Sequence, residues 1–207
     1  MAKKVVDKWK AKVWYTVLAP DMFDSKEIGE VPATEDEVLI NRIIKTGLGE
    51  LSGDRSKMYS RLLFRIDVVK GKTAYTKLIG HELDRDYLRM LARRRRSIVD
   101  VVQDVETKDG QRVRVKVSIF TARRVSNPLK TVMRAAIVGA IKAKAKDTNF
   151  NQFEQEAIFG KLSADIFGAI KKMAPVKRVE IRKTELHEAF TAAEEAKKAE
   201  AEQPVAA

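Results

Sequence analysis

Residues 98–121 read IVDVVQDVETKDGQRVRVKVSIFT, and apolar and polar side chains alternate along both halves of this stretch. Alternation with a period of two is typical of β-strands that bury one face. The apolar residues stand at odd positions on both sides of the turn: Val99, Val101 and Val105 before it, and Val113, Val115, Val117 and Ile119 after it. The stretch therefore predicts a β-hairpin whose odd-numbered side chains lie in a core.

The turn between the two predicted strands decides which residues face each other. A two-residue loop at positions 109 and 110 would place odd positions opposite even ones. A three-residue loop, Lys108–Gly110 with Gly110 in the left-handed region, keeps odd positions opposite odd ones. We therefore expect the three-residue loop. On the polar face it pairs Asp104 with Arg114 and Glu106 with Arg112, as opposite charges.

Positive charge is concentrated around this hairpin. The chain has 41 Lys and Arg against 29 Asp and Glu, a formal net charge of +12. Residues 111–146 contain no acid but ten bases, and Arg93–Arg96 lie just upstream. Like charges at this density repel one another, and a polyanion such as nucleic acid relieves the repulsion.

The composition also bounds the class of protein. A chain of 207 residues that is 44% hydrophobic and 34% charged can bury a sizeable core as one large or two small domains. Cysteine is absent, which excludes a disulfide framework and a thiolate metal site and fits a reducing, cytoplasmic location. There is no apolar run near 18 residues and no signal peptide, so we expect no membrane partner.

Strands dominate to residue 121 and helices follow, which predicts an α+β fold. We expect a small antiparallel β-barrel or highly curved sheet in the first 120 residues, because closure would hide the sheet edges, followed by a helical half with one further strand. The predicted organisation is a flexible basic arm (1–12), a β-barrel-like domain with one inserted helix (13–124), a helical α+β part (125–190) and a low-complexity, disordered acidic tail (191–207).

Three helices have recognisable ends. Asp84 caps a helix over 85–95, and the arginines continue it beyond its apolar residues. Pro128 starts a long helix that runs to about Lys146 and has one apolar stripe. Thr184 is the predicted cap of a last helix, which follows a strand over 176–182.

The residues offer little for catalysis. His81 and His187 stand on different predicted elements without metal-ligand spacing, and we interpret His81 as structural. No nucleophile elbow, dinucleotide fingerprint or phosphate loop is present, so we expect neither an enzyme nor a cofactor, metal or small-molecule substrate. Two alternatives stay open: a magnesium-dependent nuclease using Asp84 and Asp86, and a regulatory RNA-binding module.

RNA is the partner that the charge pattern favours. Aromatic residues are only 7% of the chain, which favours recognition of RNA shape and backbone over sequence reading. The predicted phosphate-contacting residues are Lys3, Lys4, Lys8, Lys10, Lys12, Arg93, Arg94, Arg95, Arg96, Arg123, Arg124, Lys130, Arg134, Lys142, Lys144 and Lys146.

Several segments together resemble one family. They are KVWYTVLAPDMF at 12–23, Ile28-Gly29, GHELDRD at 80–86, the hairpin over 101–124, the helices from Pro128 and VEIRK at 179–183. In this order they are similar to the S3Ae family of small-subunit ribosomal proteins, called S3a in eukaryotes. The chain resembles the archaeal members, since it lacks the lysine-rich N-terminal extension and basic C-terminal end of the eukaryotic ones.

The resemblance implies a structural, non-enzymatic protein of cytoplasmic ribosomes. It implies a place on the platform of the small subunit near the messenger exit, where the protein holds the 3′ region of the small-subunit ribosomal RNA beside neighbouring ribosomal proteins and supports assembly and translation. The resemblance assigns no individual RNA contact to a residue of this chain.

Overall fold

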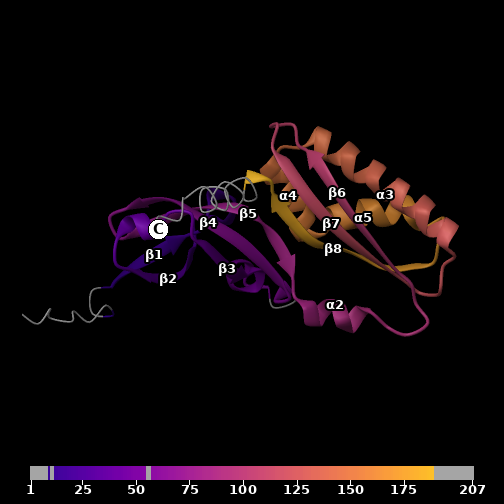
Figure 1. Cartoon of the computed structure of the whole chain (residues 1–207), viewed down its shortest axis with the longest axis horizontal. Coiled ribbons are helices and arrows are strands. Elements are labelled where there is room, and N and C mark those ends of the chain that lie inside the picture. Colours follow the sequence, from indigo (N-terminus) through magenta and orange to yellow (C-terminus); the bar gives the residue numbers. More distant parts are fainter. Residues whose placement is uncertain (1–8, 10–11, 55–56, 189–207) are drawn as a thin grey trace, which may run out of the picture. The chain divides into compact units, whose positions relative to one another are not determined.

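A computed structural model describes residues 9, 12–54 and 57–188 of the chain (Figure 1). The strands are β1 (Val13–Leu18), β2 (Glu27–Ala33), β3 (Ile43–Gly47), β4 (Ser60–Lys70), β5 (Thr73–Leu83), β6 (Ile98–Glu106), β7 (Arg112–Thr121) and β8 (Val176–Leu186). The helices are α1 (Leu48–Ser52), α2 (Arg85–Leu91), α3 (Asn127–Asp147), α4 (Phe150–Phe159) and α5 (Lys161–Ile170), with short 3-10 helices at Asp21–Phe23 and Asp36–Val38. The chain divides into two compact units between Leu78 and Ile79.

The central hairpin, β6 with β7, has the predicted register. Asp104 lies opposite Arg114 and Glu106 opposite Arg112, without a bulge over the whole ladder. The loop closes through hydrogen bonds from the Thr107 N–H to the Gln111 carbonyl (3.0 Å) and from the Gly110 N–H to the Thr107 carbonyl (2.9 Å). Gly110 has φ of 73°, the left-handed conformation that the three-residue loop requires. The prediction drawn from the apolar alternation is confirmed.

The apolar face of this hairpin forms the core of the second unit. Its odd-numbered valines pack with side chains of α3, α4 and α5, which cover that face of β6, β7 and β8 (Figure 1). On α3 the fully buried residues are Met133, Ile137, Ile141 and Ala145, spaced four apart on one side of the helix. Burial of each large aliphatic side chain contributes about 1.5–3 kcal/mol. Because the hairpin packs here, the units divide at residue 78 and not after residue 124.

The first unit is built on β1. This strand pairs antiparallel with β2 and parallel with β5, and β3 pairs with β4, which pairs with β5. Tyr15 and Val17 point into a core with Leu39 and Ile66. Trp14, on the other face of β1, is 53% exposed. The region before residue 79 is therefore strand-rich, as expected.

The expected barrel is not supported. The eight strands of the described residues form an open, mixed sheet in the order β2-β1-β5-β8-β7-β6, with β4 and β3 added on β5. Two of the edge strands have features that protect an edge without closure. The edge strand β2 carries Pro32 and the exposed acids Glu27 and Glu30, and β3 is only 5 residues long. Proline and charge both discourage pairing with a further strand.

A close approach of β5 to β8 holds part of the second unit together. At Gly80, an added Cβ would lie 2.8 Å from the Thr184 carbonyl carbon and would overlap the carbonyl oxygen. Thr184 is fully buried within β8, two residues before the strand ends, so the prediction that it caps a helix is wrong. The strand predicted over 176–182 continues to Leu186.

Two further findings concern the ends of the chain and its helices. No helix among the described residues is long and apolar enough to cross a membrane. The predicted arm to residue 12, except Trp9 and Lys12, and the predicted tail 191–207 lie outside the described residues.

Candidate nucleic-acid interface

The arginine run Arg93–Arg96 forms a turn and not a helix end. Helix α2 stops at Leu91, Ala92 is extended, and Arg95 has φ of 62°. The predicted helix to residue 95 is therefore too long. The chain must leave the helix here, because Ser97 is already aligned with Thr121: the Ser97 N–H donates to the Thr121 hydroxyl (2.9 Å) and the Thr121 N–H to the Ser97 carbonyl (3.0 Å).

The same alignment brings a second arginine segment to this turn. The Thr121 hydroxyl donates to the Arg123 carbonyl (2.6 Å), and the Val125 N–H donates to the Ser97 hydroxyl (3.1 Å). Arg123 and Arg124 are therefore held beside the strand that leaves the arginine turn. Both side chains are exposed, as are those of residues 93–95.

A third basic segment, which is not among the predicted phosphate-contacting residues, lies at the same end. The Ala122 N–H donates to the Pro175 carbonyl (2.8 Å), and Phe120 faces Arg178 in the β7–β8 ladder. This contact places Lys171, Lys172, Lys177 and Arg178 near the two arginine segments. The three connections, α2 to β6, β7 to α3 and α5 to β8, lie at one end of the second unit (Figure 1).

The first turns of α3 complete this surface. The Arg134 Nε donates to the Asp100 carbonyl near the start of β6 (3.4 Å), which ties the helix to the hairpin at that end. We define the cationic end as Arg93–Arg96, Arg123, Arg124, Lys130, Arg134, Lys171, Lys172, Lys177 and Arg178. The segments that supply it, residues 92–99, 120–134 and 166–179, contain no Asp or Glu. That absence of acids was the signal in the sequence that could have identified the third segment.

Three other predicted phosphate-contacting residues lie elsewhere in the second unit. Lys142, Lys144 and Lys146 are near the far end of α3, about 18–24 Å from Lys130 at 1.5 Å per residue. Lys144 pairs with Glu156 (3.0 Å) and Asp165 (3.5 Å).

The predicted lysines outside the cationic end do not share one environment. The hydrogen bond to Glu156 is the main cause of the raised pKa of Lys144. Lys142 and Lys146 line a groove with the acids Asp104 and Glu106. The Lys12 Nζ lies 4.2 Å from the centre of the Trp9 ring, and Lys3, Lys4, Lys8 and Lys10 lie outside the described residues.

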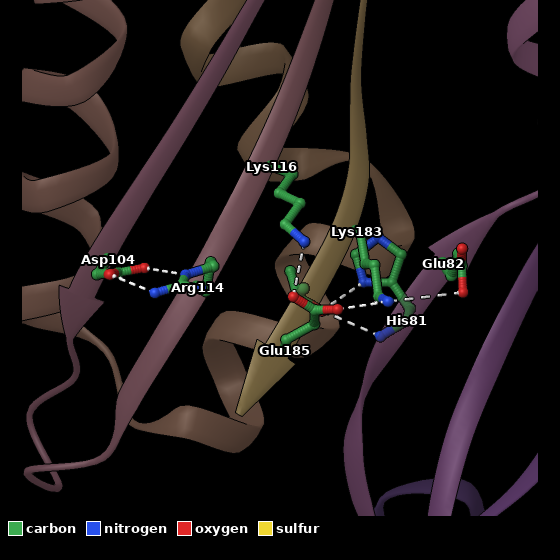
Figure 2. Close-up of polar contacts among 8 residues, drawn as sticks. His81, Glu82, Asp104, Arg114, Lys116, Lys183 and Glu185 are labelled. Carbon is green, nitrogen blue, oxygen red and sulfur yellow. Dashed lines mark hydrogen bonds and ion pairs between the residues drawn. The ribbon is translucent and has the colours of Figure 1, made fainter. Parts of the chain in front are cut away.

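The polar face of the sheet carries a ladder of ion pairs (Figure 2). The guanidinium of Arg114 donates twice to the Asp104 carboxylate (2.7 and 3.0 Å). The Lys116 Nζ contacts Glu185 (2.8 Å). Lys183 contacts Glu185 as well and lies 3.9 Å from Glu82. In this ladder, Arg114 and Lys116 from the acid-free residues 111–146 are thus neutralised by acids outside that stretch.

These pairs predict that the protein loses stability in acid. Hydrogen bonding to Arg114 lowers the pKa of Asp104 below its ordinary 3.8. Burial raises the pKa of Glu185, but hydrogen bonds from Lys116 and Lys183 outweigh it, and the pKa falls below 4.5. Both pKa values are lower in the folded state, so the stabilisation is present above the unfolded pKa and is lost as pH falls through the folded pKa.

We therefore expect the free energy of unfolding, measured with urea at successive pH values, to decrease below about pH 4.5. In Glu185→Gln this acid-dependent decrease should be smaller. An identical pH profile in both proteins would contradict a role for Glu185.

His81 belongs to a buried polar cluster and not to a reactive site. Its Nε2 faces the Ile181 carbonyl (3.2 Å), and its Nδ1 lies 2.9 Å from the Thr184 hydroxyl and 3.5 Å from Glu154. The Thr184 hydroxyl donates to Glu154 (2.8 Å). The three side chains are at most 2% exposed, so no macromolecular substrate can reach them. The cluster joins β5, β8 and α4.

The carboxylates of the nuclease alternative do not form a metal site. Asp86 is paired with Arg89 (3.5 Å), and both side chains are exposed. Asp84 stands at the helix cap, where its carbonyl accepts from the Leu88 N–H (3.2 Å). Within the described part of the chain, no three His, Cys, Asp or Glu residues lie together so that they could hold a metal ion.

The fold and the surface define a class: a mixed α/β protein in which three acid-free basic segments meet at one end of the second unit. A model of the Ribosomal S3Ae family matches residues 1–189. The chain therefore belongs to this family of small ribosomal subunit proteins, which is non-enzymatic.

Curated relatives are similar to this chain over most of its length. The small ribosomal subunit protein eS1 of Methanothrix thermoacetophila is 45% identical over 186 residues, 89% of this chain and 88% of the relative. The eS1 protein of Sulfurisphaera tokodaii is 42% identical over 182 residues, 88% of this chain and 94% of the relative. That of Archaeoglobus fulgidus is 43% identical over 187 residues, covering 89% of each chain. The resemblance inferred from the sequence segments is confirmed, and the nuclease alternative is not supported.

Proposed function

We propose that this protein is a structural constituent of the small ribosomal subunit and binds ribosomal RNA through its cationic end. The observation that carries the proposal is the convergence of three acid-free basic segments at one end of the second unit. The names of the relatives, small ribosomal subunit proteins, support the choice of partner.

The physical basis is the release of counterions from RNA. Each cation that neutralises a phosphate makes the dependence of log affinity on log salt steeper by roughly 0.7–0.9, and dense positive charge favours a polyanion over a single charged group. Most side chains of the cationic end are exposed, so they can reach phosphates without a change in the fold. Contacts to phosphates position the protein without reading the sequence of the RNA.

Finer features of the proposal follow from the family resemblance. The RNA is the 3′ region of the small-subunit ribosomal RNA, and the position is the platform near the messenger exit in cytoplasmic ribosomes. Neighbouring ribosomal proteins contact the remaining surface. In this role the protein acts by scaffolding, which supports subunit assembly and translation.

Sedimentation of a native-cell lysate through sucrose tests the proposal. We expect the protein to travel with the small-subunit RNA at moderate salt and to stay with it at high salt. The matched control is the same lysate after digestion of its RNA, in which the protein should move to the light fractions. Recovery mainly in the light fractions of the undigested lysate at moderate salt would contradict the proposal. That result would favour the alternative of a regulatory module acting away from the ribosome.

A further inference from the structure

A pocket of about 460 Å³ lies beside α2, on the polar side of the second unit. Five of its lining side chains are cationic: Arg85 and Arg89 from α2, Lys116 from β7, and Arg182 and Lys183 from β8. None of these residues is part of the cationic end. The pocket is therefore a second concentration of positive charge, and it is concave.

The charges in this pocket are only partly neutralised. Lys116 and Lys183 are held by Glu185, the central carboxylate of the ladder (Figure 2). Arg89 lies 3.5 Å from Asp86. Among the described residues, neither Arg85 nor Arg182 has a carboxylate within ion-pair distance, so two guanidinium groups keep their full charge at the wall of the pocket.

The ladder also keeps the site in shape. The Glu185 side chain is 13% exposed, and its carboxylate pairs with the ammonium groups of both Lys116 and Lys183. These ion pairs hold the two lysine side chains in place on the sheet. Leu83 and Leu88 supply an apolar wall between the charged groups. A preformed cavity with an apolar wall and a few convergent polar groups is the usual form of a binding site.

The chemistry of the lining selects a phosphate. A guanidinium group binds phosphate oxygens through two parallel hydrogen bonds, and an arginine pair is well suited to this geometry. The volume exceeds that of a lone phosphate ion and leaves room for an attached sugar beside the leucines. A phosphodiester within a chain therefore fits the pocket better than a free anion does.

We propose that this pocket seats one backbone phosphate and ribose of an RNA strand, with Arg85 and Arg182 as the phosphate-binding residues. The inference rests on the proposed function, since it takes RNA as the partner. It adds a contact site separate from the cationic end.

The test compares RNA binding of the full-length protein with that of the double variant Arg85→Gln and Arg182→Gln. Small-subunit ribosomal RNA is titrated at several salt concentrations. Loss of two phosphate contacts should lower the salt slope by roughly 1.4–1.8 and weaken the affinity by about tenfold or more. Arg85 is exposed and Arg182 is half-buried, and neither belongs to a core cluster, so the circular dichroism spectrum and the melting temperature should change little. The control, Lys108→Gln with Lys161→Gln, removes two exposed cations elsewhere and should change the slope much less.

The outcomes separate this inference from the proposed function. If the pocket variant binds RNA like the wild type while a variant of the cationic end binds weakly, the pocket assignment is overturned and the proposed function stands. If both variants bind like the wild type, both proposals fall.

A titration with inorganic phosphate, followed by nuclear magnetic resonance, distinguishes the sources of the phosphate. Binding of inorganic phosphate without any effect of the variant on RNA affinity would show a free-anion site and overturn the RNA assignment.

Discussion

Gly80→Ala is expected to lower the free energy of unfolding by about 3 kcal/mol or more, the upper range for overpacking a well-packed site. The added Cβ would overlap the carbonyl oxygen of Thr184, which is backbone and cannot rotate away. Relief requires β5 to move from β8 around the Glu82–Lys183 pairing. The same movement would disturb the buried contacts of His81 with Thr184 and Glu154. Thermal unfolding followed by far-ultraviolet circular dichroism measures the effect, because α3, α4 and α5 lie in this unit.

Gly139→Ala is the matched control for this substitution. Gly139 lies in the interior of α3, and an added Cβ there would meet nothing within 4 Å. Alanine is favoured over glycine in a helix by about 1 kcal/mol, so the control should be slightly more stable than the wild type. If Gly80→Ala unfolds at the same temperature as Gly139→Ala, β5 does not approach β8 closely enough at Gly80 to exclude a Cβ atom.

The hairpin shows how much of the fold could be predicted from sequence. The pairing of its strands depends on two local features: the apolar residues stand at odd positions, and Gly110 adopts a left-handed conformation in the turn. Residues 98–121 contain the signal for both. Burial of one face then permits a single register, because a shift by one residue would expose every valine. Where the apolar pattern and the turn conformation require the same register, that register can be predicted without knowledge of the tertiary structure.

Thr184 shows why other parts could not be predicted. A threonine before two acidic positions is a plausible helix cap by its local sequence. In the structure it is fully buried in β8, where its hydroxyl donates to Glu154 on α4. That partner is 30 residues away in the chain. A buried polar side chain is stabilised by its hydrogen bonds, and partners this distant in sequence leave no local signal.

Only part of the candidate site could be predicted, because some of its segments meet through contacts between residues that are distant in sequence. The arginine segments at 93–96 and 123–124 stand out as runs of one charge, and the hairpin register brings them together. The lysines at 171, 172 and 177 join them only through the β7–β8 ladder, whose register no local pattern reveals. Conversely, the sequence pattern does not distinguish Lys144 from Lys142 and Lys146, but α4 and α5 supply acids that neutralise it.

Replacing Arg93, Arg94, Arg95, Arg123 and Arg124 with glutamine should weaken binding to small-subunit ribosomal RNA roughly a thousandfold at physiological salt. The salt slope should fall by about 3.5–4.5, because five phosphate contacts are lost. All five side chains are exposed, so the melting temperature should change little. Lys142→Gln with Lys146→Gln is the comparison, since these lysines lie at the far end of α3 beside Asp104 and Glu106. A loss of affinity per removed charge that is clearly larger for the arginines would locate binding at the cationic end. An equal loss per charge would show that RNA responds only to the net charge of the protein, and the convergence of the three basic segments would then have no role in binding.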